Sequence, residues 1–327
     1  MSVRADTGET GVPGLATAAS MLVVLVALFT VTGAFRPTDL PSYAETTRQI
    51  IGMGLMLTLI PSYMIAGASI GQRRSIALVE ELRERLPDPD QADAAISAMR
   101  GALRKTWRWG VVVGLTLGLL NTQPLTAIRR ENPVVEGALS FGQLNMWVVI
   151  GLLMGVRFTA AREFRRLAEV VKLDLLRPDQ LKAISRAGVV DVVIIAGALL
   201  LTPLQSLDAE FRWYNYQFGL LVALPAVTFF LIWPLLPLHR RNQQDREARL
   251  TEVDRQLAEI APTTPTDVEA STHLETLLAH RARLRSARTW PLSTGLLSRV
   301  VLYLVIPPLA WAGAAVVERV VDAFLAG

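Results

Sequence analysis

Residues 216–238 read YQFGLLVALPAVTFFLIWPLLPL and contain no charged side chain. A helix rises about 1.5 Å per residue, so a run of this length crosses a hydrocarbon core of about 30 Å. Soluble proteins seldom contain so long an apolar run, because nothing in a small core would cover all of its sides. The stretch therefore predicts a membrane-spanning helix.

Six further stretches share this apolar character, and hydrophobic residues make up 51% of the 327 residues, with a mean hydropathy of +0.36. The first stretch is longer than the core of a signal peptide and no small-residue cleavage pattern follows it, so we expect it to be retained. The sequence predicts an all-α, polytopic membrane protein with seven transmembrane helices. The six other spans lie near residues 14–35, 49–71, 107–126, 140–158, 187–207 and 293–315.

The basic residues predict how these spans are oriented, because Lys and Arg are retained on the cytoplasmic side of short loops. They concentrate in the segments that follow spans two, four and six, whereas the opposite side offers only scattered arginines. We therefore expect a cytoplasmic N-terminus, an extracytoplasmic C-terminus and a location in the cell membrane, the inner one where there are two. The basic clusters lie at 73–74, 83–85, 100–105, 162–166, 172–186, 240–255 and 281–288.

The cytoplasmic segments read as helices rather than bare loops. Residues 75–86 and 91–105 form two helical patterns joined by Pro87-Asp88-Pro89-Asp90. Such helices either lie on an anionic membrane surface or pack together beneath the bundle, and interleaved acidic residues favour packing. We predict a six-helix bundle at 1–238 with a cytoplasmic hairpin at 72–106 and a helix pair at 159–186, a cytoplasmic helical segment at 239–292, and a last transmembrane helix at 293–327.

Glycines at four-residue spacing recur in three neighbouring spans. Small residues at this spacing let transmembrane helices approach closely, either within one subunit or between subunits. Packing within one subunit is the simpler interpretation. The glycines concerned are Gly67, Gly71, Gly110, Gly114, Gly118, Gly151 and Gly155.

Few ionisable residues fall at membrane depth, and such residues are candidates for function. Asp191 lies near the start of span five, Arg157 at the inner end of span four and Arg299 in span seven. Either arginine would compensate the Asp191 carboxylate, so a structural ion pair is the first interpretation. A proton or ion relay is the alternative, although a single acidic residue does not make a chain of relay groups.

The sequence argues against an enzyme, a metal or other cofactor, and a nucleic-acid partner. It contains no cysteine, and its histidines lack acidic neighbours at metal-binding spacing. The net charge of +4 arises from loops rather than from one basic face. Residues 67–71 match the G-x-S-x-G pattern of serine hydrolases, with His239 at the same interface, but that pattern needs a strand-to-helix turn that a membrane helix does not offer.

The order of features resembles the seven-transmembrane ion channels related to insect odorant and gustatory receptors. The resemblance is carried by residues 266–289 as a cytoplasmic half-helix, a break at Trp290-Pro291 and a membrane half at 293–322. It implies four subunits that meet through their cytoplasmic layer, and a central cation pore lined by the last helix and opened by a ligand. Residues 302–307 differ from that family's aromatic and glutamine signature in this helix.

Three functions follow as hypotheses. The first is a homotetrameric ion channel whose last span lines the pore with Ser298, Tyr303, Pro307 and Pro308. The second is a small-solute transporter with its site among spans three to five near Asp191, and the third a non-conducting scaffold or sensor acting through its cytoplasmic helices. The expected partners are the lipid bilayer, further copies of the chain, and a small-molecule ligand or ion.

Overall fold

A computed structural model describes residues 11–36, 44–121, 133–172, 182–206, 213–260 and 268–286, together with Trp290, Gly295, Ser298, Val301, Leu302 and Val305. Of these residues 92% are helical and none lies in a strand, which confirms the all-α class. The helices are α1 (Leu15–Val31), α2 (Ala44–Leu82), η2 (Arg83–Arg85), α3 (Asp90–Arg100), α4 (Ala102–Leu120), α6 (Pro133–Val170), α7 (Lys182–Leu200), η4 (Thr202–Ser206), α8 (Trp213–Ile232), η5 (Trp233–Leu235), α9 (Leu236–Ile260) and α10 (Val268–Ser286).

Four helical segments in the described part of the chain are long and apolar enough to cross a membrane, and α1 is a shorter apolar helix. This supports a membrane protein. The number of spans and the side on which each terminus lies remain predictions, and most of the predicted seventh span lies outside the described residues. The four segments are Thr47–Arg85, Pro133–Val170, Ile184–Gln205 and Tyr216–Glu259.

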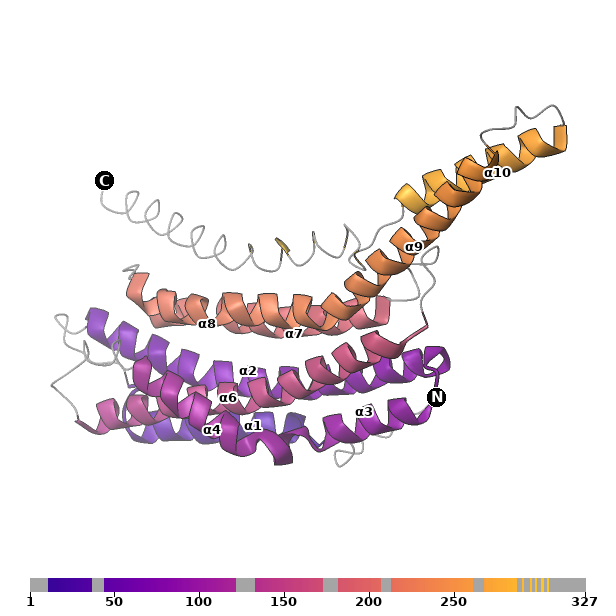
Figure 1. Cartoon of the computed structure of the whole chain (residues 1–327). Coiled ribbons are helices and arrows are strands. Elements are labelled where there is room, and N and C mark those ends of the chain that lie inside the picture. The colour runs from indigo at the N-terminus through magenta and orange to yellow at the C-terminus, as the bar shows by residue number, and fades with distance from the viewer. Residues whose placement is uncertain are drawn as a thin grey trace, which may run out of the picture.

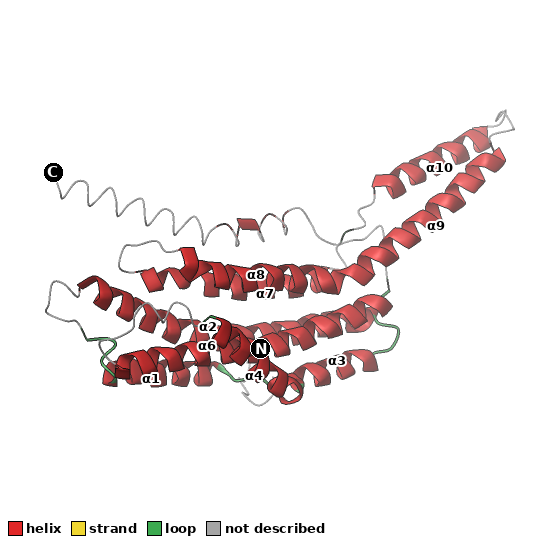
Figure 2. Ribbon diagram, turned by 60° about the vertical axis from the view of Figure 1, so that its left-hand side comes forward, coloured by secondary structure: helices red, strands yellow, loops and turns green. Residues whose placement is uncertain are grey.

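The helices lie side by side in three layers (Figure 1). Helices α2 and α6 form the middle layer, with α1 and α4 on one side and α7 and α8 on the other. Helix α9 continues from α8 through η5 and leaves the bundle obliquely, and α10 packs back along it to form a projecting hairpin (Figure 2). We call this hairpin the α9–α10 arm.

Two large hydrophobic cores stabilise the described part of the bundle, and a small third cluster lies between α7 and α8. The first lies between α1, α2, α6 and α7 and contains Phe29, Leu57 and Leu139, all essentially inaccessible to solvent. The second joins the end of α2, α3, the last turns of α6, the start of α7 and the start of α9, and includes Met99 and Phe164. Buried residues of the 72–106 region thus share a core with α6, α7 and α9.

Helix α3 shows how the sequence produces this second core. Ala92, Ile96 and Met99 recur at helical spacing on one face, and all three are buried. The Nε2 of Gln72 on α2 donates a hydrogen bond to the Met99 carbonyl at 2.7 Å, which ties the end of α3 to α2. The predicted helix at 91–105 is divided at Gly101, because α3 ends at Arg100 and α4 begins at Ala102.

Candidate functional site

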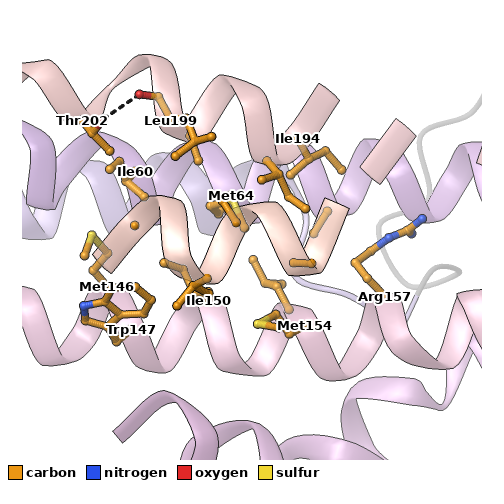
Figure 3. Close-up of a pocket in the computed structure, with 18 of the residues that line it drawn as sticks. Ile60, Met64, Met146, Trp147, Ile150, Met154, Arg157, Ile194, Leu199 and Thr202 are labelled. Carbon is orange, nitrogen blue, oxygen red and sulfur yellow. Dashed lines mark hydrogen bonds between the residues drawn. The ribbon is translucent and has the colours of Figure 1, made fainter. Parts of the chain in front are cut away.

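A cavity of about 130 Å³ lies among α2, α6, α7 and α8 (Figure 3). Each of the four helices contributes one stripe of side chains to its wall. The lining residues are Met56, Ile60, Met64 and Ala68 of α2, Met146, Trp147, Ile150, Leu153, Met154 and Arg157 of α6, Asp191, Ile194, Ile195, Ala198 and Leu199 of α7, Thr202 and Gln205 of η4, Gly219, Val222, Ala223, Ala226 and Phe230 of α8, and Asn121.

The wall follows directly from helical periodicity. Residues 56, 60, 64 and 68 are spaced by four along α2, and residues 146, 150, 153 and 157 repeat by three or four along α6. The stripe on α6 covers about 16 Å of helix axis at about 1.5 Å per residue. On α8 the small residues Gly219, Ala223 and Ala226 leave the space that larger side chains would fill.

One end of the cavity is closed by a buried ion pair. The Nε of Arg157 donates to the Asp191 carboxylate, and both residues are about 5% exposed. The Arg157 Nη2 donates to the Ser75 hydroxyl at 3.0 Å, and its Nη1 lies 3.5 Å from the Gln72 side-chain oxygen. Of the two partners that the sequence offered for Asp191, the structure brings Arg157 to it, whereas Arg299 lies outside the described residues.

The other end carries polar groups of a different kind. Thr202 donates its hydroxyl proton to the Leu199 carbonyl at 2.7 Å, Gln205 is buried, and the Asn121 carbonyl accepts a hydrogen bond from the Gln143 amide. Trp147 is 4% exposed, and its indole Nε1 has no hydrogen-bond acceptor among the described residues. A buried donor without a partner is unusual, and a ligand's acceptor atom would satisfy it.

The spaced glycines belong to close helix contacts within this chain. A Cβ added to Gly151 would lie 2.2 Å from the Gly110 carbonyl oxygen, and one on Gly114 would lie 2.5 Å from the Trp147 carbonyl oxygen. Helices α4 and α6 therefore meet backbone to backbone. The remaining predicted glycines face side chains instead: Gly67 and Gly71 face Ile194, Gly118 faces Leu144, and Gly155 faces Thr106.

The residues predicted to line a pore are mostly beyond what the structure describes. Tyr303, Pro307 and Pro308 lie outside the described residues. Ser298 is exposed, and its hydroxyl donates to the Gly295 carbonyl at 3.1 Å.

The hydrolase-like motif lies inside the continuous helix α2 rather than at a strand-to-helix turn. The Ser69 hydroxyl is buried with no hydrogen-bond partner among the described residues, so it forms no serine–histidine pair there. His239 instead stacks on Trp290, with 4.2 Å between ring centroids. Within the described ranges, no group of three His, Cys, Asp or Glu residues is placed to hold a metal ion.

Most of the cavity wall is not predicted from the sequence. The site near Asp191 was predicted among spans three to five, whereas the cavity uses spans two, four, five and six, and only Asn121 comes from the end of span three. One signal was available: four of the eight methionines lie at positions that repeat along the inward faces of α2 and α6. Methionine is flexible and commonly lines adaptable binding surfaces.

Comparison with protein-family models, with curated proteins and with solved structures gives no match for this chain.

Proposed function

We propose that this protein binds a small, largely apolar solute inside its helical bundle and carries it across the membrane. The observation that supports this most directly is the cavity among α2, α6, α7 and α8, with an apolar wall and polar groups at its two ends. Apolar cavities of about 150 Å³ in proteins stay free of water and bind molecules the size of benzene. The proposed solute is of that size, or has a segment of that size.

The composition of the wall favours an apolar solute over an ion. Between Arg157 and Asp191 at one end and Thr202 and Gln205 at the other, the wall consists mainly of Met, Ile, Leu, Val, Ala and Phe side chains. A hydrated ion entering this space would lose water without gaining oxygen ligands, which is strongly unfavourable. A hydrocarbon ring or chain has no such hydration shell to lose when it enters the cavity.

Trp147 is a potential hydrogen-bond donor to the proposed solute. Its Nε1–H is the buried donor that lacks an acceptor among the described residues, and Trp147 lines the cavity. The ring is held by an edge-to-face contact with Phe218, whose centroid lies 5.2 Å away. The Nε1 atom itself is buried, so a hydrogen-bond acceptor on the solute, such as a carbonyl, ether or hydroxyl oxygen, would reach it only once the indole ring turns toward the cavity.

The Arg157–Asp191 pair is the proposed barrier at the inner end. It joins α6 to α7, and Arg157 also contacts Ser75 on α2, so three of the four cavity helices are fastened at this level. Passage of a solute needs these helices to separate there. The channel hypothesis concerns a different part of the chain, the last span, and stays a prediction.

The direct test measures binding by fluorescence quenching of Trp147. The purified protein in nanodiscs is titrated with a brominated phenol, which has an apolar ring and an acceptor oxygen, and quenching is compared with that of Trp147→Phe to isolate the Trp147 signal. We expect saturable quenching in the wild type. Ala226→Phe, which places an aromatic ring in the cavity, is expected to remove the saturable component.

Leu224→Phe is the matched control, because Leu224 is 49% exposed on the same helix and lies outside the cavity wall. That variant should quench like the wild type. Quenching that rises linearly without saturation, or that is equal in Ala226→Phe, would show that the probe reaches Trp147 from the lipid and that the cavity binds nothing. Flux of the same probe across liposomes then separates a transporter from a binding protein that conducts no solute.

A further inference from the structure

Three cations at the N-terminal end of α4 are exposed and uncompensated. Arg104, Lys105 and Arg108 are exposed, and none of their side chains forms an ion pair or a hydrogen bond with another residue that the structure describes. The partly exposed Arg83, by contrast, is compensated by ion pairs with Glu80 and Asp93. Positive charges three and four residues apart on a helix repel each other, so an anion placed among them is favoured.

These cations lie on a face of α4 that continues as hydrocarbon. Helix α4 lies at the edge of the bundle and packs along α6 (Figure 1). Positions 104, 108, 112, 115 and 119 follow the helical repeat on its outer face. Val112, Leu115 and Leu119 on this face are 40–62% exposed. An apolar stripe with a cationic end matches the arrangement of acyl chain and head group in a phospholipid.

Two tryptophans flank the cations. Trp107 and Trp109 are 49% and 74% exposed, and on a helix they fall on either side of the face that carries Arg104 and Arg108. The Arg108 guanidinium lies over the Trp107 ring at 5.5 Å from its centroid. Exposed tryptophans of this kind concentrate at the level of lipid head groups. They place the three cations at the depth of the phosphate.

We infer that the outer face of α4 binds an anionic phospholipid, with its head group at Arg104, Lys105 and Arg108 and an acyl chain along Val112, Leu115 and Leu119. The site lies on the face of α4 away from α6 and is independent of the cavity and of the proposed solute. A zwitterionic phospholipid has the same chains and phosphate, but its own ammonium competes with the protein cations. Preference for net negative charge is therefore the defining property.

The test uses tryptophan quenching by lipids brominated on their acyl chains. The full chain is reconstituted in phosphatidylcholine nanodiscs that contain a small, equal fraction of brominated phosphatidylglycerol or brominated phosphatidylcholine. The difference in quenching between the wild type and a Trp107→Phe/Trp109→Phe variant reports which lipid lies beside α4. We expect the wild type to be quenched at a much lower fraction of phosphatidylglycerol than of phosphatidylcholine, and added salt to reduce the difference.

The triple variant Arg104→Gln/Lys105→Gln/Arg108→Gln should lose this preference. Each basic residue near an anionic surface is worth roughly a fivefold change in binding, so the three together give on the order of 100-fold. Arg104→Lys/Arg108→Lys keeps the charge and should keep the preference, which attributes the loss in the triple variant to its missing charge. An unchanged melting temperature of the triple variant shows that it still folds.

A second triple variant controls for total charge. Arg249→Gln/Arg283→Gln/Arg285→Gln removes three cations from the α9–α10 arm and should leave the preference unchanged. Equal quenching of the wild type by both lipids would overturn the proposal, as expected if a second copy of the chain covers α4. An equal loss in the arm variant, or an unchanged preference in the first triple variant, would overturn it as well.

Discussion

The two sides of helix α6 differ sharply in how they pack. Toward α4, the backbones touch, and a single added Cβ on Gly151 would collide with the Gly110 carbonyl. Toward α2, α7 and α8, the same helix presents Met146, Ile150 and Met154 to a cavity of about 130 Å³. Glycine creates the first arrangement because it removes the side chain between two helices. Long flexible side chains create the second because they fill a gap incompletely.

The difference separates a fixed side of the bundle from an adjustable one. Helices α4 and α6 cannot slide past each other without steric overlap, so we expect them to move as one unit. The cavity side offers side chains that change rotamer at little energetic cost, and its helices are joined by the buried ion pair at one end and by apolar contacts along the wall. A site that admits and releases a solute needs side chains that can move, and we expect it on the cavity side of α6.

The largest expected effect comes from breaking the ion pair on the adjustable side. Asp191→Asn leaves the Arg157 charge buried with only the Ser75 and Gln72 contacts, and loss of one partner of a buried pair typically costs about 3–5 kcal/mol. Reversible unfolding in mixed detergent micelles measures this loss.

The double variant Arg157→Met/Asp191→Leu is the companion measurement. It removes both charges together, so we expect it to recover most of the stability that Asp191→Asn loses. A double variant as unstable as the single one would show that shape at this position, rather than charge compensation, holds α6 to α7.

A matched pair of glycine substitutions compares the two sides directly. Gly151→Ala places a methyl group against the α4 backbone and should destabilise the protein by about 1–3 kcal/mol. Gly219→Ala places the same group in α8, where nothing lies within 4 Å, and should be neutral or stabilise by up to about 1 kcal/mol, since alanine favours helix. Thermal unfolding of both variants in the same detergent gives the comparison. Equal effects would contradict the distinction between the two sides.

The smallest effect is expected where exposed charges tie α3 to the end of α2. The hydrogen bonds from Arg83 lower the pKa of the Asp93 carboxyl below its ordinary value of 3.8. Because the folded state favours the charged carboxylate, its contribution is present above the unfolded pKa and disappears as the pH falls through the folded one.

Asp93→Asn should therefore lower the melting temperature slightly at about pH 6, and the difference from the wild type should shrink as the pH falls below 3.8 through the lowered folded-state pKa of Asp93. The variant and the wild type are compared by melting curves across this range. A difference that persists unchanged in acid would mean that Asp93 acts through packing or capping and not through its charge.

The sequence predicted the helices well and the site incompletely. Apolar runs long enough to cross a membrane are a local property, and α2, α6, α7 and α8 fall where those runs are. The predicted depth of each residue in the membrane left two candidate partners for Asp191, namely Arg157 and Arg299. The cavity was not predicted, because it depends on which faces of four helices meet. Contacts between helices that are distant in the sequence determine those faces.

The glycine pattern illustrates the same limit at a single position. Spacing indicated that Gly110, Gly114 and Gly151 permit close approach, and it could not say which helix approaches. The structure pairs α4 with α6 at these residues, whereas Gly67 and Gly71 accommodate the branched side chain of Ile194 on α7. Two identical motifs thus perform different packing roles.

The uninterrupted helical path from α8 through η5 into α9 has a mechanical consequence. Residues 213–260 remain helical from the cavity wall to the far end of the α9–α10 arm, and Arg246 ties the arm together by donating to the carbonyls of Leu284 and Arg285. The 25 residues of α9 span about 37 Å. A tilt of α8 by about 5° would therefore swing the tip of the arm by about 3 Å. We expect the arm to act as a lever, in which a small tilt beside the cavity becomes a displacement of several ångströms at the tip.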